Sequence, residues 1–256
     1  MNNFVNQEVL DGNDIRPVIV NVGNFSKPVD GKPGLLTLDE VETMFHEFGH
    51  ALHGLLSQCT YKSVAGTSVA RDFVELPSQI MENWAFQKEV LADYARHYET
   101  GEVIPDSLVA KINAAGNFNQ GFMTTELAAA SILDLKWHML SELPSAETSF
   151  VEEFEKNACK EMGLIDEIIP RYRSTYFAHI FSGGYSAGYY SYLWAEVLDK
   201  DAFELFMQKG IFDPETAMSF RHNILEKGGS DEPMDLYRRF RGADPDPAAL
   251  TRARGL

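Results

Sequence analysis

The chain has 256 residues, of which 45% are hydrophobic and 12% aromatic, so it can bury a core that suits one large domain or two small ones. Its formal net charge of −16 argues against a nucleic-acid-binding protein, because such proteins usually present a basic surface. No stretch approaches the roughly 20 apolar residues of a membrane-spanning helix, which argues against an integral membrane protein.

The first elements in chain order are a loop, a strand and a long helix. Residues 1–16 are polar and predict a loop, whereas the β-branched run at residues 16–25 predicts a short strand. Residues 37–40, Thr-Leu-Asp-Glu, match a capping box, and apolar residues recur at helical spacing after it. We therefore predict a helix over residues 38–57.

The rest of the chain is predicted to be helical as well. A second capping-box pattern predicts a helix that starts near Asp72 and runs through Trp84, with Pro77 expected to kink it or to delay its start. Further helices are predicted across 90–140, with breaks near 101–105 and 116, and over 147–162, 170–181, 187–208, 214–226, 232–241 and 246–253. The expected fold class is mainly α, with a small strand region near the N-terminus and a single domain over residues 1–256.

The first predicted helix contains the motif His-Glu-x-x-His at residues 46–50. His46 and His50 lie one turn apart on one helix face, so both rings can reach one zinc ion at about 2.0–2.1 Å. Glu47 is placed to take a proton from a zinc-bound water. Gly49 costs about 1 kcal/mol in a helix relative to Ala, which suggests close approach of another backbone or of the substrate. The motif therefore predicts a metallopeptidase, and the alternative is a helix face with surface histidines.

The motif does not supply the third zinc ligand. A metzincin would have Gly at position 53 and His at position 56, and the chain has His53 and Leu56, so that class is excluded. One rigid helix cannot easily bring three rings to one ion, so we expect His53 to be buried or to support the ligands.

A carboxylate from another helix is the other source of a third ligand, and the downstream candidates are Asp72, Glu75 and Glu82. Glu75 and Glu82 are seven residues apart and share a helix face. One of them could bind the metal while the other supports a histidine N–H. The residues alone do not choose between the candidates.

Several longer motifs accompany the histidines. They are FHEFGHALH at 45–53, GT at 66–67, DFVELPSQ at 72–79, ENW at 82–84, PRYRS at 170–174, FAHIF at 177–181 and GGYSAGYYSYLW at 183–194. In this order they resemble the family of thimet oligopeptidase, oligopeptidase A and bacterial peptidyl-dipeptidase. Two stretches, RDFVE at 71–75 and LYRRFRG at 236–242, look most like the bacterial peptidyl-dipeptidases, or dipeptidyl carboxypeptidases.

This resemblance implies a multi-helix, zincin-type catalytic domain that contains one Zn²⁺ ion. Glu75 matches the glutamate that is the third zinc ligand in the family, beside His46 and His50.

The resemblance also gives roles to residues beyond position 170. His179, Tyr185 and Tyr192 match the positions that stabilise the oxyanion or hold the substrate backbone. Without the resemblance, the tyrosines between 185 and 192 would be interpreted as an aromatic core face, and His179 as a structural residue.

Short peptides are the implied substrates, and the implied reaction is release of dipeptides from the C-terminus. The alternatives are an endo-oligopeptidase of the same family and a non-catalytic peptide-binding fragment. Release of dipeptides requires recognition of a free carboxylate, which arginine binds well. The candidates are Arg71, Arg171, Arg173 and Arg221, unless ordinary salt bridges use them.

Members of the family that the chain resembles carry a long helical N-terminal portion, which forms the other wall of a deep channel. We expect the present chain to be a catalytic-domain fragment that lacks this portion as a partner. A cytoplasmic location is also expected, because the two cysteines, Cys59 and Cys159, lie far apart in no metal-type spacing, and residues 1–7 do not resemble a signal peptide.

Overall fold

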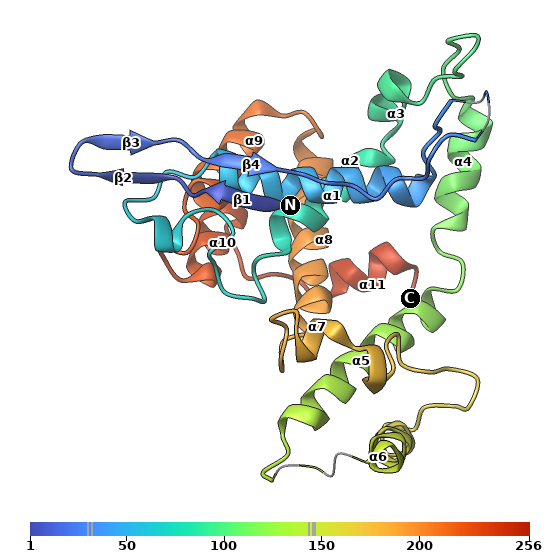
Figure 1. Ribbon diagram of the computed structural model, residues 1–256. Coiled ribbons are helices and arrows are strands. Elements are labelled where there is room, and N and C mark those ends of the chain that lie inside the picture. Colours follow the sequence, from blue (N-terminus) through green and yellow to red (C-terminus); the bar gives the residue numbers. More distant parts are fainter. Residues whose placement is uncertain (30, 32, 143, 145–146) are drawn as a thin grey trace. The chain divides into compact units, whose positions relative to one another are not determined.

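The computed structural model describes residues 1–29, 31, 33–142, 144 and 147–256 (Figure 1). The chain divides into two compact units, one formed by residues 1–115 and 195–253 and the other by residues 116–194 and 254–256. The described part is mainly α-helical, with short strands near the N-terminus, so the predicted fold class is confirmed. The expectation of a single domain stays a prediction.

Residues 1–20 form a β-ribbon, whereas a loop was predicted for the first 16 of them. The ribbon consists of two antiparallel pairs: β1 (Asn2–Val5) with β4 (Val18–Val20), and β2 (Glu8–Leu10) with β3 (Asn13–Ile15). Asp11 and Gly12 connect β2 to β3 with φ angles of +52° and +80°, as an Asp-Gly hairpin turn requires. The loop prediction was wrong because the strands are polar and largely exposed, so they lack an alternating apolar pattern.

Helix α1 (Leu38–Leu55) begins at the predicted capping box and ends two residues earlier than predicted. The Glu40 N–H donates to Thr37 Oγ1 at 3.2 Å, and the Thr37 N–H donates to Glu40 Oε2 at 2.8 Å. These two bonds satisfy backbone donors that the first helical turn would leave unpaired. Strand β4 lies alongside this helix (Figure 1).

Helix α2 (Leu76–Ala85) starts four residues later than the Asp72 capping pattern predicted. Pro77 lies in its first turn, where a missing N–H costs nothing, and its ring disfavours a helical turn before it. Residues 71–75 form turns instead, so the predicted delay by Pro77 is confirmed. Glu75 therefore occupies the N-cap position of α2, with only 3% of the residue exposed.

Gly49 allows α1 and α2 to pack backbone against backbone. A Cβ atom at this position would lie 2.2 Å from the carbonyl oxygen of Pro77 and 2.6 Å from the Cα of Ser78, so no side chain fits. The expected close approach of another backbone is thus confirmed. It brings the histidine-bearing face of α1 next to the first turn of α2.

The first unit contains further helices from both of its chain segments, residues 1–115 and 195–253. They are the 3-10 turn η1 (Lys62–Val64), α3 (Lys88–Tyr94), α4 (Asp106–Ala115), most of α8 (Ser191–Lys209), α9 (Pro214–Phe220), the π-helical turn η3 (Arg221–Leu225), α10 (Pro233–Arg241) and α11 (Ala248–Arg254). The fully buried Tyr237 donates its hydroxyl to Asp201 at 2.6 Å, and Arg241 forms a two-point ion pair with the same carboxylate. This arrangement gives the LYRRFRG stretch a structural role.

The second unit contains helical segments from the middle of the chain. They are α5 (Gln120–His138), α6 (Thr148–Glu161), η2 (Ser174–Tyr176), α7 (Ala178–Phe181) and the start of α8. The continuous helix predicted over 170–181 is wrong, because η2 and α7 are single turns. The buried carboxylate of Glu155 accepts a hydrogen bond from the Ser174 N–H at 2.7 Å and pairs with Arg173, so a tertiary contact takes the place of helical bonding.

Two further findings concern the whole described chain. None of its helices combines the length and apolar character that crossing a membrane requires. Cys59 and Cys159 are free thiols, the first buried and the second partly exposed.

Candidate functional site

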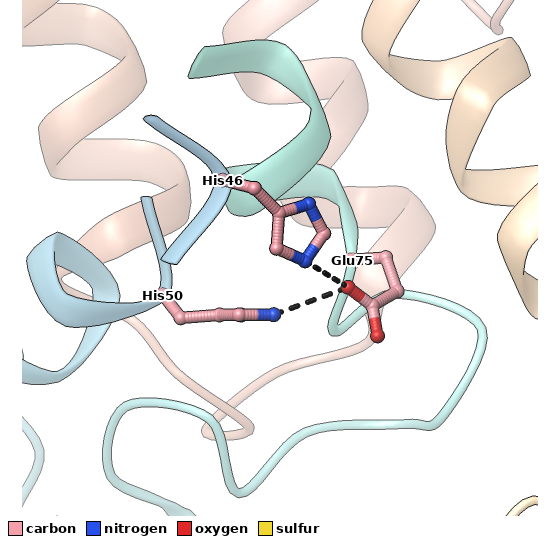
Figure 2. Close-up of side chains that lie close together, drawn as sticks. All are labelled: His46, His50 and Glu75. Atoms are coloured by element: carbon pink, nitrogen blue, oxygen red, sulfur yellow. Dashed lines mark ion pairs between the residues drawn. The ribbon is translucent and has the colours of Figure 1, made fainter. Parts of the chain in front are cut away.

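His46, His50 and Glu75 converge in the first unit (Figure 2). Oε2 of Glu75 lies 3.4 Å from Nε2 of His46 and 3.1 Å from Nε2 of His50. Ligands at about 2.0–2.1 Å from a tetrahedral zinc ion are separated by about 3.3 Å, which matches both distances. The spacing and the chemistry of the donors therefore fit a zinc ion bound by two histidines and one glutamate.

Two elements place these three groups. The histidines project from consecutive turns of α1, with ring centroids 4.9 Å apart and ring planes nearly perpendicular. Glu75 approaches from the start of α2, and the hydroxyl of Ser78 donates to its Oε2 at 2.9 Å. The site thus depends on helical periodicity for the histidines and on α1–α2 packing for the carboxylate.

Glu82 supports His46 from the opposite side of the ring. The Nδ1 of His46 lies 2.6 Å from Oε1 of Glu82, which is about two turns further along α2 than Glu75. A hydrogen bond in which Nδ1 donates leaves Nε2 free to bind a metal and fixes the ring orientation. The sequence left Asp72, Glu75 and Glu82 open as ligands, and in the structure Glu75 faces both Nε2 atoms, Glu82 faces Nδ1, and Asp72 does not join the group.

The surroundings of His46 favour positive charge. Burial lowers the pKa of this histidine, but hydrogen bonds to Glu75 and Glu82 outweigh burial and raise the pKa to about 10. Burial and the neighbouring Glu82 also raise the pKa of Glu42 to about 7. A site that strengthens proton binding in this way is also suited to a metal cation, because both respond to the same negative charge.

His53 is completely buried in the same helix. Burial, assisted by the charge of His50, lowers the pKa of His53 to about 3, so the ring stays neutral. Neither of its ring nitrogens has a hydrogen-bond partner among the described residues. It does not join the cluster of potential metal ligands, so the expectation of a buried His53 is confirmed.

Glu47 is partly exposed beside this cluster. Its carboxylate pairs with the amino group of Met1, and its backbone carbonyl accepts a hydrogen bond from the Asn21 side chain at 2.9 Å. The Glu47 side chain is 31% exposed, so its carboxylate is accessible beside the candidate metal ligands, as a proton acceptor must be.

A polar network behind Glu82 was not predicted. The Nζ of Lys200 donates to the side-chain oxygen of Asn83 at 2.8 Å, and the Asn83 amide donates to the buried Asp199 at 2.8 Å. This network links α2 to α8 within the first unit. The only feature of the sequence that could have indicated this network is the position of Asn83 directly after Glu82. A single asparagine in a helix does not reveal a hydrogen-bond partner 116 residues away.

The second unit brings together His179, Tyr185 and Tyr192, the other three candidates. Tyr185 and Tyr192 stack with their centroids 5.0 Å apart, and the His179 ring lies 6.2 and 6.3 Å from them. Both tyrosines pack on a buried cluster that includes Phe177 and Tyr189. Burial, followed by the charge of Arg171, lowers the pKa of His179, which favours its neutral form.

Asp134 holds the loop that carries Tyr185, and sequence reasoning missed this residue. Its completely buried carboxylate accepts hydrogen bonds from the N–H groups of Ala187 and Tyr189 at 3.0 and 2.8 Å. Ala187 has a φ angle of +53°, which ends any helix there, so α8 starts at Ser191 and not at the predicted residue 187. A single aspartate within an apolar stretch of α5 was the only signal in the sequence.

The candidate arginines differ in their contacts. Arg173 pairs with Glu155, and Arg221 pairs with Glu226 at 2.7 Å, so both form the ordinary salt bridges named as the alternative. Arg171 lies close enough to His179 and Tyr189 to affect their pKa values. Arg71 also has interaction partners.

Comparisons with known proteins agree with the resemblance seen in the motifs. A family profile described as Peptidase family M3 matches residues 1–256. The chain is 46% identical over its whole length to a dipeptidyl carboxypeptidase of Escherichia coli, and 44% identical over 96% of its length to an oligopeptidase A of the same species. A probable cytosolic oligopeptidase A of Arabidopsis thaliana is 41% identical over 96% of the chain. The chain spans only 37% of the first relative and 36% of each of the other two.

Proposed function

The chain belongs to peptidase family M3, and from this we propose that it is the catalytic part of a zinc metallopeptidase that hydrolyses short peptides. The observation that carries the proposal is the convergence of Nε2 of His46, Nε2 of His50 and Oε2 of Glu75 at tetrahedral ligand spacing. These three residues would hold one Zn²⁺ ion and leave one coordination position open, as catalytic zinc sites do.

Glu47 is the proposed general base. The chemistry that zinc supplies when bound is polarisation of the scissile carbonyl and acidification of the attacking water. The carboxylate of Glu47 accepts the proton of that water and then donates it to the nitrogen of the leaving amine. Its partial exposure and its position one residue from His46 support this role.

His179, Tyr185 and Tyr192 are proposed to donate hydrogen bonds to the developing oxyanion or to the substrate backbone. Their rings gather in one cluster of the second unit, and their side chains stay partly exposed. The lowered pKa of His179 keeps that ring neutral, so its remaining N–H can donate without adding a charge.

Release of dipeptides from the C-terminus is the proposed reaction. The dipeptidyl carboxypeptidases are 46% and 47% identical to the chain, and the bacterial oligopeptidases A are 42–44% identical. Arg171 is the proposed carboxylate-binding residue, because Arg173 and Arg221 are already paired with glutamates. The second candidate is endopeptidase action on short peptides.

The relatives are considerably longer than the chain, which bears on how much activity residues 1–256 have by themselves. We propose that these residues form a single catalytic domain, and that full activity needs a further portion corresponding to the rest of those relatives. The free thiols support a cytoplasmic location for the protein.

The Glu47→Gln substitution tests the mechanism. Because glutamine keeps the size of the side chain but cannot accept a proton, hydrolysis should fall by about 10²–10⁴-fold. Zinc content, measured by elemental analysis, should remain one ion per chain. Normal activity of this variant on a peptide that the parent chain cleaves would contradict the proposed role.

Product analysis tests the reaction type. Mass spectrometry of a peptide mixture digested by the chain should show losses of two residues from the C-terminus. Amidating that terminus should block the release of dipeptides, whereas an endopeptidase would tolerate it. Cleavage of amidated peptides at internal bonds would favour the second candidate.

A further inference from the structure

A pocket of about 340 Å³ lies beside Glu47 in the first unit. One wall is the segment at residues 21–25, which follows β4 and runs along α1 (Figure 1). The other wall is a face of α1 formed by Glu40, Thr43, Met44 and Glu47. The proposed general base therefore lines this pocket as well.

The segment at residues 21–25 is tied to α1 at both ends. The side chain of Asn21 donates to the backbone carbonyl of Glu47 at 2.9 Å, and the N–H of Ser26 donates to Glu40 Oε1 at 2.6 Å. Two hydrogen bonds to one helix fix the width of the space between segment and helix. The pocket is thus built before any ligand enters, which lowers the entropic cost of binding.

Apolar side chains supply much of the pocket surface. Phe25 and Met44 are 39% and 43% exposed, which is high for large hydrophobic residues in a folded chain. The ring of Phe25 folds over Gly23, where an added Cβ would lie only 2.5 Å from the nearest ring atom. The glycine therefore permits this position of the ring, and the flexible methionine opposite can adapt to different shapes.

We propose that this pocket binds an apolar side chain, aromatic or long aliphatic, of the peptide substrate, from a residue that flanks the scissile bond. The proposal rests on the proposed function. Glu47 acts at the scissile bond, and consecutive Cα atoms are about 3.8 Å apart, so the side chain of a residue next to that bond lies within reach of a pocket that Glu47 itself lines. Burial of Phe25 and Met44 against that side chain supplies the binding free energy.

Peptide hydrolysis measures the preference directly. Peptides that carry Phe, Leu, Ala, Lys or Asp at each position flanking the cleaved bond should show kcat/KM at least about tenfold higher for Phe or Leu than for Ala at one of the two positions. Phe25→Ala and Met44→Ala should each lower this ratio several-fold. Gly23→Ala should lower it too, because the added Cβ displaces the ring of Phe25.

Matched controls separate the pocket from general effects on the fold. Phe212→Ala and Met207→Ala remove side chains of the same types elsewhere in the first unit, at positions that are 64% and 55% exposed, and they should leave the ratio unchanged. An equal preference for all five side chains, or a preference for Lys, would overturn the proposal and leave the proposed peptidase function intact. A ratio unaffected by either pocket variant would overturn it as well.

A binding measurement covers the case of slow turnover. The zinc-loaded Glu47→Gln variant, labelled with ¹³C in its methionine methyl groups, is titrated with an amino-acetylated peptide containing Phe at the preferred position. The Met44 signal, assigned through Met44→Leu, should shift through the ring current of the bound phenylalanine, and the Met207 signal should not. Binding of the peptide without a shift at Met44 would contradict the proposal. If the chain neither binds nor hydrolyses any peptide, both the proposed function and this proposal are overturned.

Discussion

The two groups of candidate residues are built in different ways. In the first unit, His46 and His50 are placed by the periodicity of one helix, and Glu75 is placed by direct packing of the next helix on Gly49. In the second unit, His179, Tyr185 and Tyr192 come from a single-turn helix, a loop and the start of α8, and the buried Asp134 holds that loop. A site on regular helices depends on steric fit, whereas a site on a loop depends on a few hydrogen bonds.

Gly49→Ala should have the largest effect on the helix-based site. The added methyl group would clash with the carbonyl of Pro77, so α1 and α2 must separate and carry Glu75 away from the histidines. Overpacking of this kind costs about 1–3 kcal/mol, so zinc affinity should fall by about 10–100-fold, measured by competition with a chelator.

Gly121 provides a matched control for this substitution. It also lies within a helix, α5, but apart from that helix's own backbone no atom of the described residues beyond its two neighbours lies within 4 Å of an added Cβ. Gly121→Ala should therefore leave zinc affinity unchanged and slightly stabilise its helix. Equal zinc affinity in both variants would show that backbone packing at Gly49 does not position Glu75.

Glu82→Gln tests the carboxylate that supports His46. Glutamine can still accept a hydrogen bond from Nδ1, but without the negative charge the ring becomes a weaker ligand. Zinc affinity should fall by about 10–100-fold, and the absorption spectrum of the cobalt-substituted protein should change. The exposed Glu89→Gln should alter neither property. An unchanged zinc affinity in Glu82→Gln would show that the contact between Glu82 and His46 does not affect metal binding.

Asp134→Asn tests the loop-based site. The Asp134 carboxylate accepts hydrogen bonds from the N–H groups of Ala187 and Tyr189, and the variant loses its negative charge. Hydrogen exchange of those two amides should therefore accelerate by about tenfold or more. Peptide hydrolysis should fall by about the same factor, with zinc content unchanged. Asp213→Asn removes the charge from a partly exposed carboxylate that also accepts a backbone N–H, at the start of α9, and it should not affect the loop. Loss of zinc in Asp134→Asn would contradict the inference that different contacts hold the two groups.

A smaller effect is expected from His53, which shares α1 with the proposed ligands. Its folded pKa of about 3 lies below the ordinary value of 6.5, so the unfolded chain binds a proton that the folded chain excludes. Stability should therefore fall as pH drops below about 6.5. Between pH 7.5 and 5.5 this contribution is about 1.4 kcal/mol, and His53→Gln should remove it.

Urea unfolding of the metal-free protein at the two pH values measures this contribution. The exposed His97→Gln serves as the control and should keep the full pH dependence of the parent chain. The same pH dependence in His53→Gln as in the parent chain would show that the buried ring does not resist protonation.

The sequence by itself determined the elements that depend on neighbouring residues. The capping box at Thr37, the turn spacing of His46 and His50, and the delay of α2 by Pro77 all follow from local backbone geometry, and the structure contains each of them. The longer motifs pointed to the M3 family, which the whole-chain match confirmed. These features could be predicted because each one is encoded within a few residues.

Only the tertiary structure decided which groups meet across long separations. Glu75, and not Glu82, faces both Nε2 atoms. The reason is that Gly49 lets the first turn of α2, at Pro77 and Ser78, pack directly against α1. The predicted helix over 170–181 is interrupted because the buried Glu155 accepts a hydrogen bond from a backbone N–H 19 residues away. Helix α8 starts later than predicted because the buried Asp134 accepts hydrogen bonds from backbone N–H groups 53 and 55 residues away. Helical propensity is a weak local preference, and one buried carboxylate that needs hydrogen bonds outweighs it.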